Sequence, residues 1–359
     1  MWSTFFRWTF KTTFRRFGPN SRELSRAVVS TNGFRRSTYL LAVLAFPWPF
    51  KTPEEPKPES VTRQLFAASL KSLATRDFVK ADETLHELLR HLYDSSEKGL
   101  IDRDTYVTQR ARVCSEMANI NLLMGEYEAA ERLVKQVIQD CVDSHVSTSD
   151  AMIVELSLKL ALIYEKLGTV DKADLGFKYC IENQEEKIGR LNDDTDKDQI
   201  ANEKALLGMC YNYYSKFLFF QGNYDSALSF AKKGLDMATQ LYPPEHPNCL
   251  NLRCDIAVIE AQQNHFDSAR EHLMQAAKEA ERSFSLIAPK DKENVPSESD
   301  ALGACLIHIL LQLASVEVLA DQREAALKAV AEAESILPKL SSSSSSRKKI
   351  DQFVADYGL

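Results

Sequence analysis

A six-residue pattern recurs along this chain of 359 residues: glycine, any residue, an aromatic residue, two further residues and alanine, with an apolar stretch on either side. The clearest copies begin at Gly125 and Gly222, and weaker copies begin at Gly168 and Asn264. Glycine adopts a positive φ without strain, so a helix can end there, and a small alanine lets two helices cross closely. We interpret these residues as turn and core positions of a repeated helix pair.

The alanine of the pattern sets the register of the repeats, with intervals of 42 to 57 residues. The first and last copies are weak, because the first lacks the glycine and Arg323 replaces the aromatic residue in the last. The register positions are Ala81, Ala130, Ala173, Ala227, Ala269 and Ala326. The turn resembles the helix–turn–helix junction of tetratricopeptide repeats, whose usual period is about 34 residues. The sequence therefore predicts an all-α tetratricopeptide-repeat α-solenoid of about five to six helix pairs over residues 62–340.

Three polar segments interrupt or follow this predicted solenoid. Residues 189–196 and 288–296 read as charged surface loops, and the first lacks the glycine and glutamate spacing of a calcium-binding EF-hand. Residues 341–359 form a serine-rich tail, in which we expect Ser341–Ser346 to be disordered and a short helix to follow around Lys349–Tyr357.

The first fifty residues differ in charge from the rest of the chain. They contain eight arginines or lysines and one acidic residue, Glu23, whereas the remainder has a net charge of −14. A basic, acid-poor start is typical of a mitochondrial import signal, so we predict a transit peptide over residues 1–38. A secretory signal fits less well, because its basic region would extend over nearly forty residues. The acidic body disfavours a nucleic-acid-binding arm, and no nucleic-acid partner is expected.

Residues 39–50 form an apolar segment that is too short to cross a bilayer, which requires about twenty residues. Two fates remain open for it. It either associates with a membrane face beside Trp48 or is removed together with the import signal. Residues 51–61 then form a proline-rich linker.

The sequence lacks the common motifs of catalytic, metal-binding and nucleotide-binding sites. The seven cysteines and seven histidines have no metal-ligand spacing, and there is no phosphate loop, dinucleotide fingerprint or nucleophile elbow. We therefore expect no enzyme activity, metal, cofactor or small-molecule substrate. Scattered cysteines suit a reducing compartment such as the mitochondrial matrix.

Several phrases occur in order and at fixed separations: Val154–Tyr164, Gly176–Ile181, Glu185–Ile188 and Leu206–Cys210, with the dipeptide His246-Pro247 downstream. From about residue 115 to 280, the chain resembles the family of tetratricopeptide repeat protein 19 of mitochondria. That resemblance implies a non-catalytic factor at the matrix side of the mitochondrial inner membrane. It implies subunits of respiratory complex III as partners, a role in assembly and maintenance of that complex, and help in clearing fragments of its Rieske subunit.

Two alternative functions fit the sequence less well. The His246-Pro247 start and the 42-residue interval also resemble the long repeats of kinesin light chains, which would make the chain a cytosolic adaptor. The basic first fifty residues and the lack of room for a heptad coiled coil disfavour that interpretation. No motif supports a solenoid that carries a hydrolase site.

The repeat register also predicts a partner-binding face. The first helix of each pair is expected to line the concave side of the solenoid. The residues placed there are Arg112, Asn119, Asn212, Lys216, Phe219 and Gln262. Amides and a cation in a groove can hold an extended peptide through its backbone and carboxylates. The alternative is an ordinary solvated helix surface. The Lys-then-Asn order of a carboxylate clamp for chaperone tails is absent.

Overall fold

The computed structural model describes residues 61–75, 77–192, 195–286, 298–340 and 344–359. The predicted transit peptide, the apolar segment 39–50, nearly all of the proline-rich linker and the loop 288–296 lie outside these residues. The described residues belong to two compact units, residues 61–259 and residues 260–359, which we call the N-terminal and C-terminal units. Each unit is described separately.

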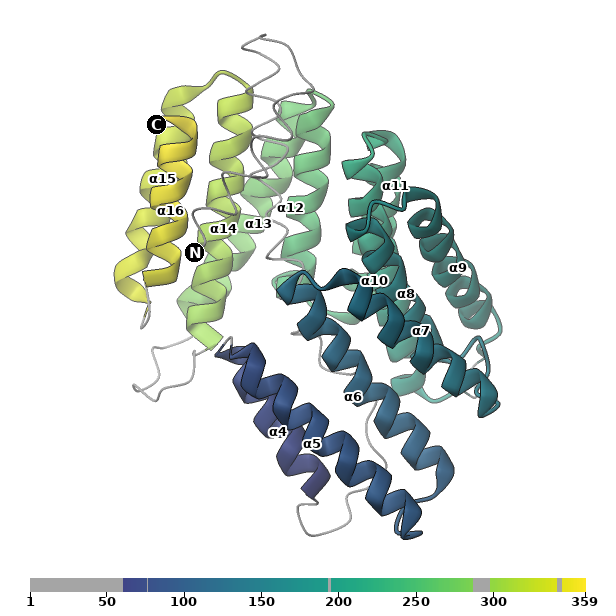
Figure 1. Ribbon diagram of the computed structural model, residues 1–359. Helices are drawn as coiled ribbons and strands as arrows, with labels where there is room; N and C mark the ends of the chain where they lie inside the picture. The colour runs from purple at the N-terminus through teal and green to yellow at the C-terminus, as the bar shows by residue number, and fades with distance from the viewer. Residues whose placement is uncertain (1–60, 76, 193–194, 287–297, 341–343) are drawn as a thin grey trace. The chain divides into compact units, whose positions relative to one another are not determined.

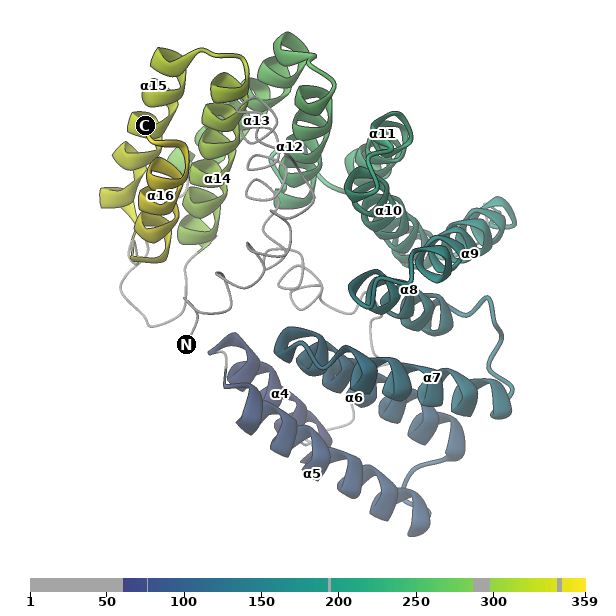
Figure 2. The same cartoon turned by 45° about the horizontal axis from the view of Figure 1, so that its top comes forward.

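The described residues form helices and no strand, and within each unit successive helices run antiparallel to one another (Figures 1 and 2). The N-terminal unit contains α4 (Val61–Ala74), α5 (Phe78–Glu97), α6 (Arg103–Met124), α7 (Tyr127–Asp143), α8 (Ala151–Lys166), α9 (Val170–Gly189), α10 (Lys197–Phe220), α11 (Tyr224–Leu241) and most of α12 (Pro247–Gln262). The C-terminal unit contains the end of α12, then α13 (Phe266–Leu286), α14 (Glu298–Leu319), α15 (Arg323–Ile336), the short 3₁₀ helix η2 (Leu337–Lys339) and α16 (Ser344–Tyr357). The chain is an all-α tetratricopeptide-type solenoid.

Five turns inside the helix pairs have the same backbone geometry. In each, one residue adopts a left-handed conformation, with φ between 60° and 84°. These residues are Gly125, Gly168, Gly222, Asn264 and Asp321. The next N–H donates to the carbonyl five residues earlier, as Glu126 does to Asn121 at 2.8 Å, which is the Schellman ending of a helix. Asn and Asp tolerate this conformation better than most residues, so the weaker copies of the pattern still form the turn.

All six register alanines are fully buried, at 0% exposure. In each, the N–H donates to the carbonyl of the residue that precedes the second helix, as in Ala81 to Asp77 and Ala326 to Gln322, both at 3.0 Å. The first and last copies of the pattern therefore share this alanine hydrogen bond with the clear ones. Six helix pairs result, from α4–α5 to α14–α15, in agreement with the predicted number.

Two glycines inside helices allow neighbouring backbones to approach. A Cβ atom on Gly176 of α9 would lie 2.9 Å from Cβ of Ala161 on α8. A Cβ atom on Gly208 of α10 would lie 3.3 Å from Cβ of Met237 on α11. Both glycines belong to the phrases that carry the family resemblance, so those phrases mark close helix crossings.

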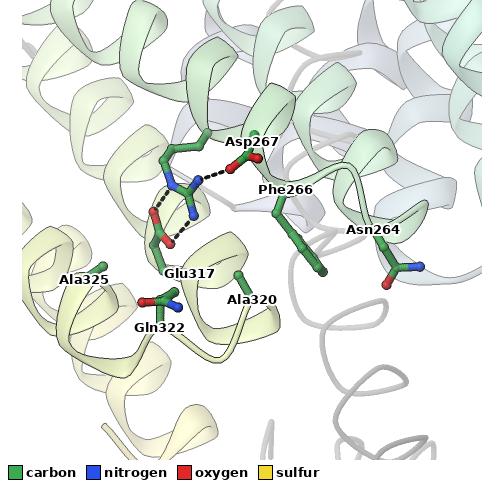
Figure 3. A pocket seen from close by; sticks show the side chains of 8 residues that line it. Asn264, Phe266, Asp267, Glu317, Ala320, Gln322 and Ala325 are labelled. Carbon is green, nitrogen blue, oxygen red and sulfur yellow. Dashed lines mark hydrogen bonds and ion pairs between the residues drawn. The ribbon is translucent and has the colours of Figure 1, made fainter.

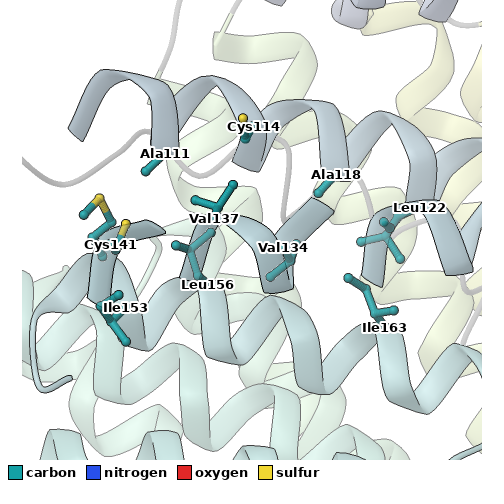
Figure 4. Close-up of a cluster of buried hydrophobic side chains, with 12 residues drawn as sticks. Ala111, Cys114, Ala118, Leu122, Val134, Val137, Cys141, Ile153, Leu156 and Ile163 are labelled. Atoms are coloured by element: carbon teal, nitrogen blue, oxygen red, sulfur yellow. The ribbon is translucent and has the colours of Figure 1, made fainter. Parts of the chain in front are cut away.

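The core between α6, α7 and α8 is built from small and branched side chains (Figure 4). Val134 and Val137 of α7 lie between Ala118 of α6 and Leu156 of α8, all at most 2% exposed. Cys114 and Cys141 belong to the same cluster. All seven cysteines are free thiols and six are buried, so they pack as small hydrophobic residues.

The C-terminal unit is centred on the apolar helix α14. Residues 302–319 have a mean hydropathy of 1.9, which by length and composition would suffice to cross a membrane, but 67% of this stretch is buried. Helices α13, α15 and α16 pack around it. In the described part of the chain, α14 is thus the central core helix of its unit.

Helix α16 begins earlier than the sequence suggests. It starts at Ser344 rather than near Lys349, so the expected disorder is wrong for Ser344–Ser346. Ser346 and Ile350 are buried, and the hydroxyl of Tyr357 lies 3.0 Å from Oγ of Ser315 on α14. Contacts with α14 and α15 therefore override the low helix propensity of serine.

Candidate partner-binding surface

Two of the six predicted partner-binding residues are core residues. Asn119 and Phe219 are each 2% exposed. The Phe219 ring lies 5.6 Å from that of Phe220 and 5.4 Å from that of Tyr224, between centroids, and so packs at the α10–α11 turn. Phe219 offers no surface to a partner, because the end of α10 turns this position toward α11 rather than outward.

Lys216 is engaged in a buried ion pair. Its Nζ atom lies 2.9 Å from Oδ2 of Asp255, and both side chains are 14% exposed. Burial lowers the pKa of Lys216 and raises that of Asp255, while their mutual attraction opposes both shifts. The pair connects α10 to α12, so Lys216→Glu would place two carboxylates together and disturb the fold as well as any binding.

Asn212 lies one turn before Lys216 on α10, and Gln262 lies on α12. Asn212 is partly buried where α10 approaches α11, and its backbone nitrogen would lie 3.7 Å from a Cβ atom on Gly234. Gln262 is partly exposed at the end of α12 and belongs to the C-terminal unit. Asn119 and Phe219 are therefore closed to a partner, whereas Arg112, Asn212 and Gln262 have partly exposed side chains.

Arg112 remains on the partly exposed face of α6. Its guanidinium carbon lies 4.4 Å from the centre of the Phe66 ring on α4, a cation–π contact. Burial lowers the pKa of Arg112, and the nearby carboxylates of Glu116 and Glu155 oppose that shift. Two turns further along α6, Nδ2 of Asn119 donates to Oε2 of Glu116 at 3.0 Å.

Arg112 and Glu116 of α6, with Glu155 and Lys159 of α8, form what we call the α6–α8 charge cluster. Both carboxylates attract both cations and so act to raise the pKa values of Arg112 and Lys159, against the effect of burial. Lys159 is 8% exposed, and its Nζ donates to the carbonyl of Ser115 at 2.9 Å and to the Ser115 hydroxyl at 2.5 Å. Two positive and two negative charges thus meet between the first helices of two successive pairs.

Glu155 and Lys159 were not predicted as site residues. Burial raises the pKa of Glu155 to about 7, although nearby Lys159 acts in the opposite direction. The sequence does contain a signal for both residues. They are the two charged residues of the otherwise mostly apolar Val154–Tyr164 phrase, and their four-residue spacing places them on one face of α8.

A second candidate is an open hollow of about 560 Å³ in the C-terminal unit (Figure 3). Arg270 of α13 dominates it and forms a two-pronged ion pair with Glu317 of α14, at 2.6 and 2.9 Å, and a further contact with Asp267 at 2.7 Å. The remaining lining residues are Asn264, Phe266, Ala320, Gln322 and Ala325. The guanidinium is satisfied by the chain itself, so this hollow holds a structural link between two helices.

No group of histidine, cysteine or acidic side chains in the described ranges could hold a metal ion. His246 has a structural role, because its Nδ1 accepts the N–H of Asn248 at 3.2 Å and its ring stacks on Tyr242 at 4.2 Å. Helix α12 begins at Pro247, a position where the missing N–H of proline costs no hydrogen bond.

The comparisons with known proteins agree with this fold. The tetratricopeptide repeat family model matches residues 208–280. The chain is 31% identical over 248 residues to Tetratricopeptide repeat protein 19, mitochondrial, of Mus musculus, a match that covers 66% of each chain. The human protein of that name is 29% identical over 218 residues, which covers 60% of this chain and 55% of the human protein. The chain therefore spans about half to two thirds of the length of these relatives.

Two solved structures show the same architecture. BtubC (BKLC) from P. vanneervenii superposes with a TM-score of 0.52 at 14% identity, covering 77% of this chain and 91% of that one. The apo form of RapI gives a TM-score of 0.53 at 13% identity, covering 84% and 72%. Identities this low show a shared fold alone.

Proposed function

The chain belongs to the family of mitochondrial tetratricopeptide repeat protein 19, and on this premise we propose that it is a non-catalytic, protein-binding scaffold at the matrix side of the mitochondrial inner membrane. Its proposed partners are subunits of respiratory complex III. Its proposed role is to support assembly and maintenance of that complex, including clearance of fragments of the Rieske subunit.

The observation that carries this proposal is the match to mitochondrial relatives over a stretch that contains the family phrases and folds as a helical solenoid. Solenoids of paired helices present extended surfaces and commonly bind other proteins. The basic first fifty residues give independent support for import into mitochondria. The thiols of Cys114, Cys141 and Cys305 have pKa values raised by burial to about 11, which makes them poor nucleophiles.

The test is to express the full chain with a C-terminal tag on a flexible linker in cells that lack their own family member. We expect the protein in mitochondria, protected from protease until the inner membrane is opened, and co-purified with complex III. Alkaline carbonate extraction would decide whether residues 39–50 remain as a membrane-associating segment. A cytosolic protein bound to kinesin heavy chains would favour the adaptor function instead.

The transit peptide has its own measurement. If residues 1–38 are removed on import, the mature protein lacks Trp2 and Trp8. An intact mass that corresponds to a start at Met1, measured on protein from mitochondria, would contradict the proposed processing.

A further inference from the structure

The open hollow of the C-terminal unit has an apolar side as well as a charged one (Figure 3). Phe266 of α13 and Ala320 at the end of α14 are partly exposed, and Ala325 of α15 is exposed. All three line the hollow, whose volume of about 560 Å³ leaves room for a long side chain from another molecule. The hollow lies within one compact unit, so its lining is fixed by the packing of α13, α14 and α15.

The charges of the lining do not balance. Glu317, which is 5% exposed, takes up the charge of Arg270 through two N–H donors at 2.6 and 2.9 Å. Asp267 is a second carboxylate beside the same guanidinium, and its side chain is fully exposed. In the described residues, its one contact is the ion pair with Nη1 of Arg270 at 2.7 Å. One cation against two carboxylates gives the lining a net charge of −1, so the hollow attracts a cation rather than an anion.

The helix dipole alone explains an acidic residue at the position of Asp267, but it does not explain the hollow. Equivalent acidic residues occupy the first turn of the second helix in three other pairs, as Glu128, Asp171 and Asp225. What distinguishes Asp267 is its place at the rim of a hollow that also contains an aromatic ring.

A guanidinium group matches this lining better than an ammonium group. Its plane stacks on an aromatic face, and its N–H groups can approach a carboxylate in pairs. The methylene stem of an arginine side chain packs against apolar surface while the charged end stays hydrated. A lysine ammonium would meet Asp267 as a point charge and lacks the plane that stacks on Phe266.

We propose that this hollow receives an arginine side chain of a polypeptide partner. The incoming guanidinium stacks on Phe266 and donates to the carboxylate of Asp267, while its stem packs against Ala320 and Ala325. The internal pair of Arg270 with Glu317 stays in place. This inference rests on the proposed function as a protein-binding scaffold and specifies a side chain that the partner presents.

One such contact contributes modestly to affinity. Exposed ion pairs and exposed cation–π contacts each change a binding constant by no more than about fivefold. The arginine therefore fixes the position of a partner that also binds elsewhere, and its effect has to be measured in isolation.

The test uses the full chain with isotope-labelled alanine methyl groups, titrated with the N-acetyl amides of arginine, lysine and citrulline. Citrulline has the shape of arginine without its charge. We expect arginine amide at millimolar concentrations to shift the methyl signals of Ala320 and Ala325 in a saturable way. Lysine amide should bind more weakly and citrulline amide should leave both signals unchanged. The signal of Ala81, in the N-terminal unit, should not respond to any of them.

Asp267→Asn should weaken binding of arginine amide about fivefold, and Phe266→Leu about threefold. The matched control is Asp171→Asn, which removes an exposed acidic residue at the equivalent place on α9 and should leave the affinity unchanged. Thermal unfolding establishes that each variant is folded. If Phe266→Leu does not fold, Asp267→Asn and the citrulline titration still decide the outcome.

The two proposals fail in different ways. Absent shifts at Ala320 and Ala325, equal binding of arginine and citrulline, or affinities that neither variant changes would overturn the arginine site, even if complex III still co-purifies. Absent co-purification of the wild-type chain with complex III overturns the proposed function, whereas arginine binding that depends on Asp267 and Phe266 would still support the site.

Discussion

The helix pairs α8–α9 and α10–α11 bury a lysine on the first helix in two different ways. Lys216 of α10 meets Asp255 at 2.9 Å and is neutralised by the chain itself. Lys159 of α8 meets only the carbonyl and hydroxyl of Ser115. The same residue type is therefore a structural link in one pair and has a donor to spare in the other. Whether a buried lysine is neutralised within the chain depends on the counter-charge that the neighbouring helix supplies.

Removal of that counter-charge should produce the largest effect. Asp255→Ala removes the carboxylate that lies 2.9 Å from the buried ammonium of Lys216, and breaking a buried ion pair costs about 3–5 kcal/mol. Urea denaturation would measure the free energy of unfolding. The control is Glu186→Ala, which removes an exposed carboxylate that pairs with Arg190 and should change stability by less than about 1 kcal/mol. Equal losses in the two variants would show that Lys216 does not depend on Asp255.

The pH dependence of stability should also distinguish the helix pair α8–α9 from the pair α10–α11. The pKa of Glu155 is raised from 4.5 to about 7 in the folded protein, so the folded state holds this proton more tightly than the unfolded state. Glu155 should therefore cause stability to fall as pH rises from about 4.5 to 7, by on the order of 3 kcal/mol. Unfolding curves of the wild type and Glu155→Gln across this range would test it, since the variant should lack that part of the slope. Parallel curves would contradict the shifted pKa.

The close helix crossings should respond unequally to an added methyl group. Gly176→Ala would place Cβ 2.9 Å from that of Ala161, a clash that should destabilise by about 1–3 kcal/mol. Gly208→Ala meets Met237 at 3.3 Å and should cost less, because the contact is longer. Differential scanning calorimetry of both variants would rank them. A larger loss for Gly208→Ala would reverse the expected order.

The smallest effect on stability is expected from Lys159→Met. Replacing a buried charge that has no ion pair by an apolar side chain of similar length removes a desolvation penalty, so stability should change by less than about 1 kcal/mol or increase. Lys216→Met would instead leave Asp255 unpaired and should be clearly destabilising. Thermal unfolding of the two variants side by side gives the comparison, and similar melting temperatures would mean that the two lysines have equivalent surroundings.

The sequence could predict the solenoid because its junctions are encoded locally. A left-handed turn residue and a buried alanine five positions later recur in one register, and Asn264 and Asp321 serve where glycine is missing. The site could not be predicted in the same way. Lys216 and Asp255 are 39 residues apart in sequence, and only the packing of α10 against α12 makes Lys216 a structural residue. Glu155 and Lys159 could have been found from their isolation within an apolar stretch.

Helix α16 also determines how the chain tolerates truncation. It covers α14, the described helix whose composition would suit a lipid bilayer, and its end is held by Arg323, which donates to the carbonyl of Gly358 at 2.5 Å. A nonsense mutation or a proteolytic cut that removes about the last fifteen residues would expose apolar surface of α14 to water. The truncated protein would tend to aggregate or to associate with lipid. Quality-control proteases would then degrade it before it could bind a partner.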